Sequence, residues 1–151
     1  MSLTFRPFAA GDRPAFERMV QLFYAPPAVL HFPPAQVMFG VFDAVLSGEH
    51  RLLGYLIEAD GQPVGYAIVS LKFETEVGGD AAWIEELYVD EPARGQGAGT
   101  AFFAFLTEEL RGRIKRLRLE VGAENEGAKR LYARLGFTPL DYEQLVIDRE
   151  F

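Results

Sequence analysis

The sequence predicts an α/β domain built on a mixed, mostly antiparallel sheet with helices on both faces. One observation is a hairpin pattern, in which the apolar flanks 51–58 and 63–73 enclose Asp60-Gly61, a dipeptide that favours a tight turn. The second observation is the order of the elements after this hairpin. Two patterns of a strand followed by a helix occupy residues 83–110 and 114–135. Hairpins followed by strand–helix units are typical of mixed α/β sheets.

The two ends of the chain supply the remaining elements. Residues 3–7 alternate apolar and polar side chains, which predicts a first strand. Asp12 is placed to cap a helix that the prolines at 26–27 stop. A second helix is expected over residues 35–46, and residues 138–147 predict one or two final strands.

Composition excludes several classes of protein. A net charge of −7 argues against a nucleic-acid binder, which needs a basic face. Without cysteine there is no disulfide or thiolate metal site, and the two histidines lack metal-ligand spacing, so we expect no metal. The chain has no run of about 18 apolar residues and no basic-then-apolar leader. We therefore expect one cytoplasmic domain over residues 1–151, without a membrane segment.

A glycine-rich turn, R-G-Q-G-A-G at residues 94–99, joins the strand at 83–89 to the helical pattern at 100–110. The N–H groups at the start of a helix are unpaired and lie at the positive end of its dipole, so such a turn binds phosphate or pyrophosphate. No lysine follows the glycines as in a P-loop, and their spacing differs from the dinucleotide fingerprint.

A second motif narrows the ligand further. Residues 125–137 read N-E-G-A-K-R-L-Y-A-R-L-G-F and fit the pattern N-x-x-A-x-x-L-Y-x-x-x-G-F. Together with R-x-x-G-x-G at residues 94–99, this pattern resembles the GNAT superfamily of N-acetyltransferases, closest to its polyamine- and diamine-acetyltransferase-like branch. The resemblance implies a GNAT-like fold, acetyl-CoA as cofactor and direct acetyl transfer to a primary amine. It also implies that the loop at 25–33 lies over the acceptor pocket, with a rigid proline connector as an equal alternative.

The resemblance assigns acetyl-CoA to three segments of the chain. Backbone groups of the strand would pair with the pantetheine amides, and the Leu87 N–H would stabilise the carbonyl oxygen as it gains charge. The glycine-rich turn would hold the pyrophosphate, and Lys129 would reach an ADP phosphate. Asn125 would contact pantetheine, cap its helix, or do both. The expected cofactor-binding residues are Leu87, Tyr88, Val89, Arg94, Gly95, Gln96, Gly97, Ala98, Gly99, Thr100, Asn125 and Lys129.

Three polar side chains are candidates for the chemistry. By resemblance Glu85 is the base that takes the amine proton, and Glu86 is the runner-up as base or as a contact for the substrate cation. Strand alternation predicts that Glu85 and Leu87 share one face and Glu86 lies on the other. We expect partial burial to raise the pKa of Glu85. Tyr132 would donate its phenolic proton to the coenzyme A thiolate. The alternatives are a surface salt bridge for Glu85 and an amphipathic core position for Tyr132.

The acceptor is constrained mainly by charge. Seven carboxylates between residues 74 and 91 oppose only Lys72 nearby, a balance that attracts small cationic amines. We expect a polyamine, diamine, amino acid or aminoglycoside-like acceptor that contacts Glu85 and Glu86. A protein N-terminus or lysine is an alternative acceptor. A non-catalytic acyl-CoA-binding module and a partner-binding protein are alternative functions. The resemblance also implies a homodimer.

Overall fold

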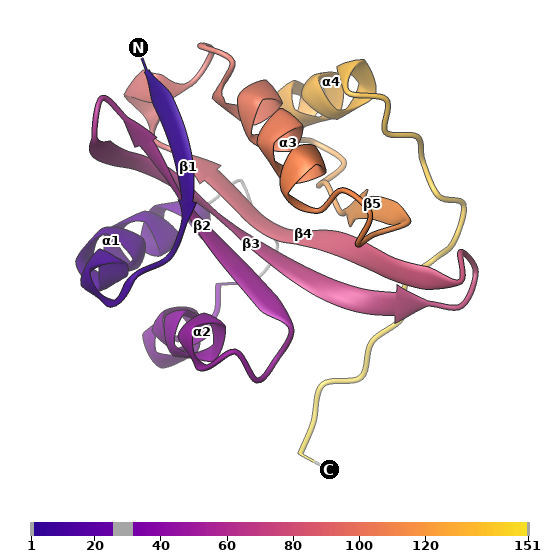
Figure 1. Ribbon diagram of the computed structural model, residues 1–151. Helices are drawn as coiled ribbons and strands as arrows, with labels where there is room; N and C mark the ends of the chain where they lie inside the picture. The colour runs from indigo at the N-terminus through magenta and orange to yellow at the C-terminus, as the bar shows by residue number, and fades with distance from the viewer. Residues whose placement is uncertain (1, 26–31, 151) are drawn as a thin grey trace.

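A computed structural model describes residues 2–25 and 32–150 and shows one open five-stranded sheet (Figure 1). The strand order is β1-β2-β3-β4-β5; the first four strands pair antiparallel, and β5 runs parallel to β4. This confirms the mixed, mostly antiparallel sheet that the sequence predicts. The strands are β1 (Leu3–Pro7), β2 (Leu52–Ala59), β3 (Gln62–Glu74), β4 (Gly79–Val89) and β5 (Arg116–Leu119).

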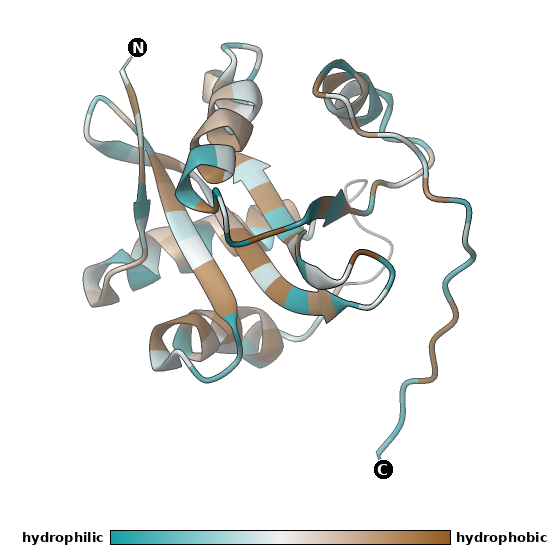
Figure 2. Cartoon of the chain, turned by 45° about the vertical axis from the view of Figure 1, so that its right-hand side comes forward, coloured by the Kyte–Doolittle hydropathy of each residue, from teal (hydrophilic) through white to brown (hydrophobic). Residues whose placement is uncertain are grey.

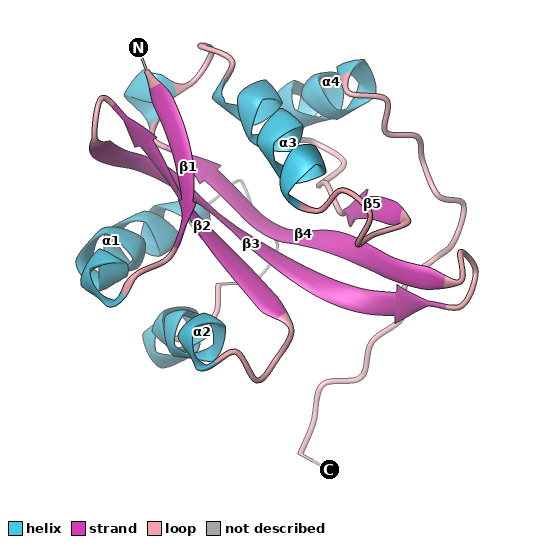
Figure 3. Cartoon of the chain, in the orientation of Figure 1, coloured by secondary structure: helices cyan, strands magenta, loops and turns pink. Residues whose placement is uncertain are grey.

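Helices cover both faces of the sheet (Figure 3). On one face lie α1 (Arg13–Phe23) and α2 (Ala35–Ser47), and on the other lie α3 (Ala98–Glu109) and α4 (Glu126–Arg134). Two short 3-10 turns, η1 (Ala10–Asp12) and η2 (Glu91–Ala93), precede α1 and α3. None of the helices in the described ranges has the length and apolar character needed to cross a membrane.

Each face of the sheet has its own hydrophobic core, and Figure 2 shows the apolar residues that run along the strands between the helices. The first core joins α1 and α2 to the sheet through fully buried Phe16, Phe42 and Tyr66. The second is centred on Phe102 and Leu106 of α3, and half-buried residues of α4 pack against it. Burial on both faces explains why the strands read as nearly continuous apolar runs.

Local turn signals in the sequence are mostly confirmed. Asp60 and Gly61 adopt positive φ angles of 51° and 81° in the turn between β2 and β3, and Gly48 ends α2 at a φ of 71°. Asp12 is an exception, because its side chain makes no cap hydrogen bond to α1. Its carboxylate instead accepts hydrogen bonds from the Arg6 guanidinium at 2.8 and 2.9 Å. The carboxylate also accepts the Ala9 N–H at 2.7 Å, so it stabilises the η1 turn and binds Arg6 instead of capping α1.

The predicted alternation along β4 fails at a β-bulge. Ile84 pairs with Val69 and Glu86 with Ile68, so Glu85 is the extra residue on β4. Beyond the bulge, each β4 side chain lies on the face of the sheet opposite to the one that simple alternation predicts. Leu87 therefore packs with Ile84 in the α3 core instead of sharing a face with Glu85.

The end of the chain also differs from expectation. Residues 138–150 contain no strand, and they run away from the body in both views of the chain (Figures 1 and 2). Leu145, Val146 and Ile147 are 90%, 82% and 71% exposed. A strand needs a hydrogen-bonding partner, and this segment pairs with none of the described strands, so an apolar pattern alone predicted it wrongly. The loop expected to cover the acceptor pocket lies largely outside the described residues, at 26–31.

Candidate active site

The central feature of the site is an unpaired stretch of strand. β4 pairs with β5 only from Ala81 to Ile84, whereas β4 itself continues to Val89. Over residues 85–89, β4 therefore has β3 on one side and none of the described strands on the other. The main-chain N–H and C=O groups along such an edge are free to bind an extended ligand that carries amides.

The glycine-rich turn lies directly beyond this edge. Gly95 and Gly97 have φ angles of 72° and 80°, a left-handed conformation that side chains disfavour, and Gly97 begins α3 without a side-chain cap. A Cβ at Gly99 would lie 2.8 Å from Leu131 Cδ2, so this glycine lets α3 approach α4. The first N–H groups of α3 are thus left to bind an anion, as a pyrophosphate site requires.

Arg94 braces the turn against the strand. Its Nε donates a hydrogen bond to the Val89 carbonyl at 2.7 Å, and its guanidinium lies 5.6 Å from the centre of the Tyr88 ring. The Gln96 side chain donates to the Pro92 carbonyl at 3.1 Å. Arg94 is exposed, and its terminal nitrogens have no hydrogen bond or ion pair within the described ranges, so they are available to a phosphate.

Tyr132 lies on the α3 side of the unpaired edge. Its ring packs against Phe103 and Phe137 at centroid distances of 6.0 and 5.8 Å, in the same core as Leu87 and Val89. Burial raises the pKa of the Tyr132 phenol, so the hydroxyl keeps its proton at neutral pH. A protonated phenol beside the edge is suited to donate to an anion formed there.

Asn125 caps α4, because its Oδ1 accepts a hydrogen bond from the Ala128 N–H at 3.2 Å. This confirms the capping interpretation and leaves the pantetheine contact as a separate prediction. Lys129 lies one turn further along α4 and forms a 3.7 Å ion pair with Glu126.

The two adjacent carboxylates of β4 have opposite environments. Glu85 is exposed, and its Oε1 accepts a hydrogen bond from Ser70 Oγ at 2.7 Å. Glu86 is only 6% exposed and accepts hydrogen bonds from the Tyr66 hydroxyl at 2.6 Å and the Tyr24 hydroxyl at 3.3 Å. Burial raises the pKa of Glu86 even though both hydrogen bonds act in the opposite direction. The expected burial of Glu85 is therefore wrong, because the bulge turns Glu86 into the core instead.

Glu85 lines a small cavity of about 190 Å³ together with Ser70, Lys72, Trp83 and Glu120. Glu85 and Glu120 are the residues that directly follow the last β4–β5 pair, Ile84 and Leu119. The cavity therefore lies where the two strands part. Ser70 was not singled out from the sequence, because only the pairing of β3 with β4 brings it beside Glu85, whereas Trp83 lies two residues before Glu85 on the same strand.

A buried ionic cluster holds the wall of this cavity. Glu74 is 5% exposed and accepts hydrogen bonds from Arg116 at 2.7 Å, Arg118 at 3.0 Å and Trp83 Nε1 at 3.1 Å. The Arg118 guanidinium also lies 4.3 Å from the centre of the Trp83 ring. Because Trp83 is held at both its face and its N–H, the cluster fixes one wall of the cavity.

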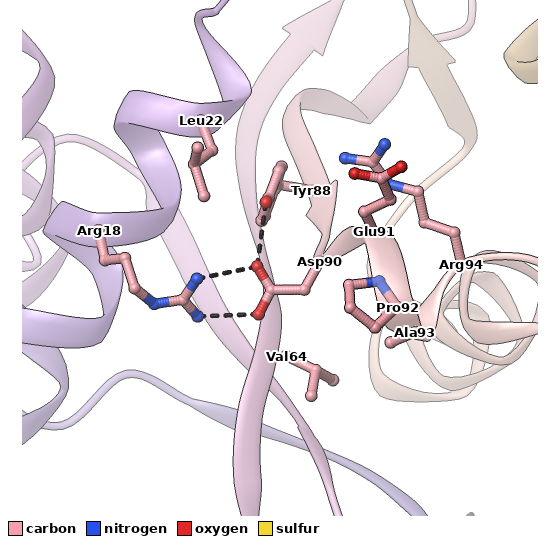
Figure 4. A pocket seen from close by; sticks show the side chains of 9 residues that line it. All are labelled: Arg18, Leu22, Val64, Tyr88, Asp90, Glu91, Pro92, Ala93 and Arg94. Atoms are coloured by element: carbon pink, nitrogen blue, oxygen red, sulfur yellow. Dashed lines mark hydrogen bonds and ion pairs between the residues drawn. The ribbon is translucent and has the colours of Figure 1, made fainter.

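A larger cavity of about 510 Å³ lies beside the start of the turn (Figure 4). Arg18 and Asp90 form a two-point ion pair in it at 2.8 and 2.9 Å, and the Tyr88 hydroxyl donates to Asp90 at 3.0 Å. These groups satisfy one another. Neither Glu85 nor Tyr132, the two side chains expected to carry the chemistry, lines this cavity.

The geometry is that of a known family. The Acetyltransferase (GNAT) family matches residues 16–137. This chain belongs to the GNAT family. The match confirms the family that the two motifs indicate. An uncharacterised N-acetyltransferase of Methanocaldococcus jannaschii is 36% identical over 85 residues, which is 55% of this chain and 38% of that protein.

Solved structures confirm the GNAT fold over the whole chain. A possible acetyltransferase from Clostridium difficile 630 superposes with a TM-score of 0.83 at 19% identity, covering 100% of both chains. A predicted acetyltransferase from Clostridium acetobutylicum, solved with acetyl-CoA, gives a TM-score of 0.76 at 18% identity and covers 97% of this chain and 96% of its own.

We predict that Glu74→Gln lowers the free energy of unfolding by about 2 kcal/mol at pH 7, because charge-assisted hydrogen bonds are lost from a buried position. Burial would raise the pKa of Glu74, but hydrogen bonds from Arg116 and Arg118 outweigh it and lower the pKa. The ionised carboxylate therefore stabilises the fold above its ordinary pKa of about 4.3, and this stabilisation is lost as the pH falls through the folded-state pKa.

Denaturant unfolding of wild type and variant at several pH values measures this difference. It should shrink under acid conditions, while Glu49→Gln, a change at an exposed position, should have little effect at any pH. A difference independent of pH would show that the Glu74 charge does not hold the cluster.

Proposed function

We propose that this protein transfers the acetyl group of acetyl-CoA directly to the primary amine of a small acceptor. The observation that carries the proposal is the unpaired edge of β4, which has Tyr132 on one side and Glu85 on the other. Acetyl-CoA supplies an activated thioester and an extended arm with two amides. The main chain of Leu87 to Val89 would bind this arm as an added strand, beside the hydrogen bond that the Val89 carbonyl already accepts from Arg94.

The remainder of acetyl-CoA fits the residues that follow the edge. The pyrophosphate would lie at the turn from Gly95 to Thr100, where glycines allow close approach to the first N–H groups of α3. The free terminal nitrogens of Arg94 and the ammonium of Lys129 supply positive charge for the phosphates. Asn125 would orient the arm while it caps α4.

In the proposed reaction, the acceptor nitrogen attacks the thioester carbonyl and the carbon–sulfur bond breaks. The Leu87 N–H stabilises the carbonyl oxygen as negative charge develops on it. Glu85 accepts the proton from the acceptor nitrogen, directly or through a water, and Tyr132 donates its proton to the departing thiolate. Glu86 is less suited to act as the base. Both of its oxygens accept hydrogen bonds from tyrosine hydroxyls, and Glu86 does not line the cavity.

Two alternatives differ in their observable consequences. A protein or peptide N-acetyltransferase would release free thiol only with peptide acceptors. A non-catalytic acyl-CoA-binding module would be stabilised by acetyl-CoA but would release no thiol with any amine. The small volume of the cavity beside Glu85 favours a small acceptor.

Tyr132→Phe should lower kcat by about 100-fold or more, because it removes only the proton donor for the thiolate. Stabilisation of the fold by acetyl-CoA should be retained, since the ring packing is kept. Thiol release and thermal unfolding measure the two effects. Tyr142→Phe is the matched control, because Tyr142 is 67% exposed and lies on the C-terminal segment. A kcat within about twofold of wild type would contradict the role of Tyr132.

Glu85→Gln should lower kcat/KM by about 100-fold with little change in stability, because an exposed base is lost. Glu86→Gln should show the opposite pattern, with a lower melting temperature and a smaller effect on turnover. It leaves one oxygen where two tyrosine hydroxyls now donate to a buried carboxylate. Steady-state kinetics and thermal unfolding of both variants test the assignment, and an exchange of the two patterns would make Glu86 the base.

We also propose that the protein acts in the cytoplasm as a homodimer, with the apolar C-terminal segment as part of the contact. Exposed apolar groups in a row mark association surfaces, and Leu145, Val146 and Ile147 form such a row. Sedimentation equilibrium should give twice the monomer mass for the wild type and the monomer mass for the double variant Leu145→Asp, Val146→Asp. A dimer that survives both substitutions would place the contact elsewhere.

A further inference from the structure

The cavity beside Glu85 contains a positive charge as well as negative ones, although most charged residues around it in the sequence are acidic. Two carboxylates, Glu85 and Glu120, and one ammonium, Lys72, line it together with Ser70 and Trp83. The cavity measures about 190 Å³, and three of its five lining residues, Lys72, Glu85 and Glu120, are exposed, so it is an open polar recess. An acceptor would therefore present a polar part of itself here.

Lys72 is exposed and lies beside the Trp83 ring. Its ammonium lies 5.8 Å from the centre of the Trp83 ring, within reach of a cation–π contact. It forms no ion pair with Glu85, Glu120 or any other side chain in the described ranges. By contrast Arg118, the other cation at the Trp83 ring, is bound to buried Glu74.

The charges of the cavity discriminate between classes of amine. A diamine or polyamine that places one nitrogen at Glu85 would bring a second positive charge towards Lys72, and like charges repel. A carboxylate attached near the reacting amine would instead pair with Lys72. The amine end would still be attracted to Glu85 and Glu120 on its arrival.

We propose that the acceptor belongs to the class of amino acids, with its amine at Glu85 and its carboxylate bound by Lys72. The proposal rests on the acetyl transfer proposed above and specifies its acceptor. Lys72 acts as a specificity residue: its position over the Trp83 ring, which the Glu74 cluster holds, sets where the carboxylate must lie. The ammonium takes no part in breaking the thioester.

The test compares acceptors that differ only by a carboxylate, namely lysine with 1,5-diaminopentane and ornithine with 1,4-diaminobutane. The wild type should favour the amino acid of each pair by about tenfold or more in kcat/KM. Lys72→Gln should remove this preference, mainly through a higher KM for the amino acid. Lys72→Glu should reverse it in favour of the diamine, and Lys72→Arg should restore most of it.

Lys115→Glu is the control for the change in net charge, because Lys115 is exposed and does not line the cavity. It should leave the preference unchanged. Thermal stabilisation by acetyl-CoA, measured for every variant, shows that the fold and the donor site are intact, and Lys72→Gln serves if Lys72→Glu fails to fold.

Two results overturn the proposal in distinguishable ways. If diamines react as well as amino acids and the Lys72 variants do not change the ratio, the acceptor class is wrong while acetyl transfer stands. If no amine releases thiol although acetyl-CoA stabilises the protein, the proposed function fails, and the acceptor assignment fails with it.

Discussion

The parting of β4 from β5 after Ile84 and Leu119 is the constraint on which the rest of the site depends. Exposed strand edges carry unpaired hydrogen-bonding groups, and proteins normally cover or interrupt them. Here the edge from Glu85 to Val89 is held open between two packed layers. β3 supports it from one side, and the turn and α3 follow directly from its end. A ligand that carries amides and a pyrophosphate would match this arrangement, with its amides along the strand edge and its pyrophosphate at the N-terminus of α3.

The bulge at Glu85 gives the open edge its chemical asymmetry. One additional residue on β4 places two neighbouring carboxylates in different surroundings, so Glu85 faces a cavity while Glu86 is buried under two tyrosine hydroxyls. The same bulge returns Leu87 to the face of Tyr132. The proton acceptor and the proton donor proposed for the reaction are thereby separated by the strand that would hold the thioester between them.

Features with local causes could be predicted from the sequence. The turn at Asp60-Gly61, the glycine-rich turn before α3 and the Asn125 cap each depend on residues within a few positions of one another. Features that depend on register could not. The burial of Glu86 follows from its pairing with Ile68 and from Tyr24 at the C-terminal end of α1, and neither is visible in the pattern around Glu86. For the same reason, the apolar residues at 145–147 indicated a strand without revealing whether a partner edge exists.

A crystal structure of the protein with coenzyme A would test the central claim most directly. The account predicts that the pantetheine amides bind the main chain between Leu87 and Val89 and that the pyrophosphate lies against the turn from Gly95 to Thr100. The thiol should then lie between Tyr132 and Glu85. Coenzyme A bound in the larger cavity beside Arg18 and Asp90, with the edge of β4 still unpaired, would contradict it.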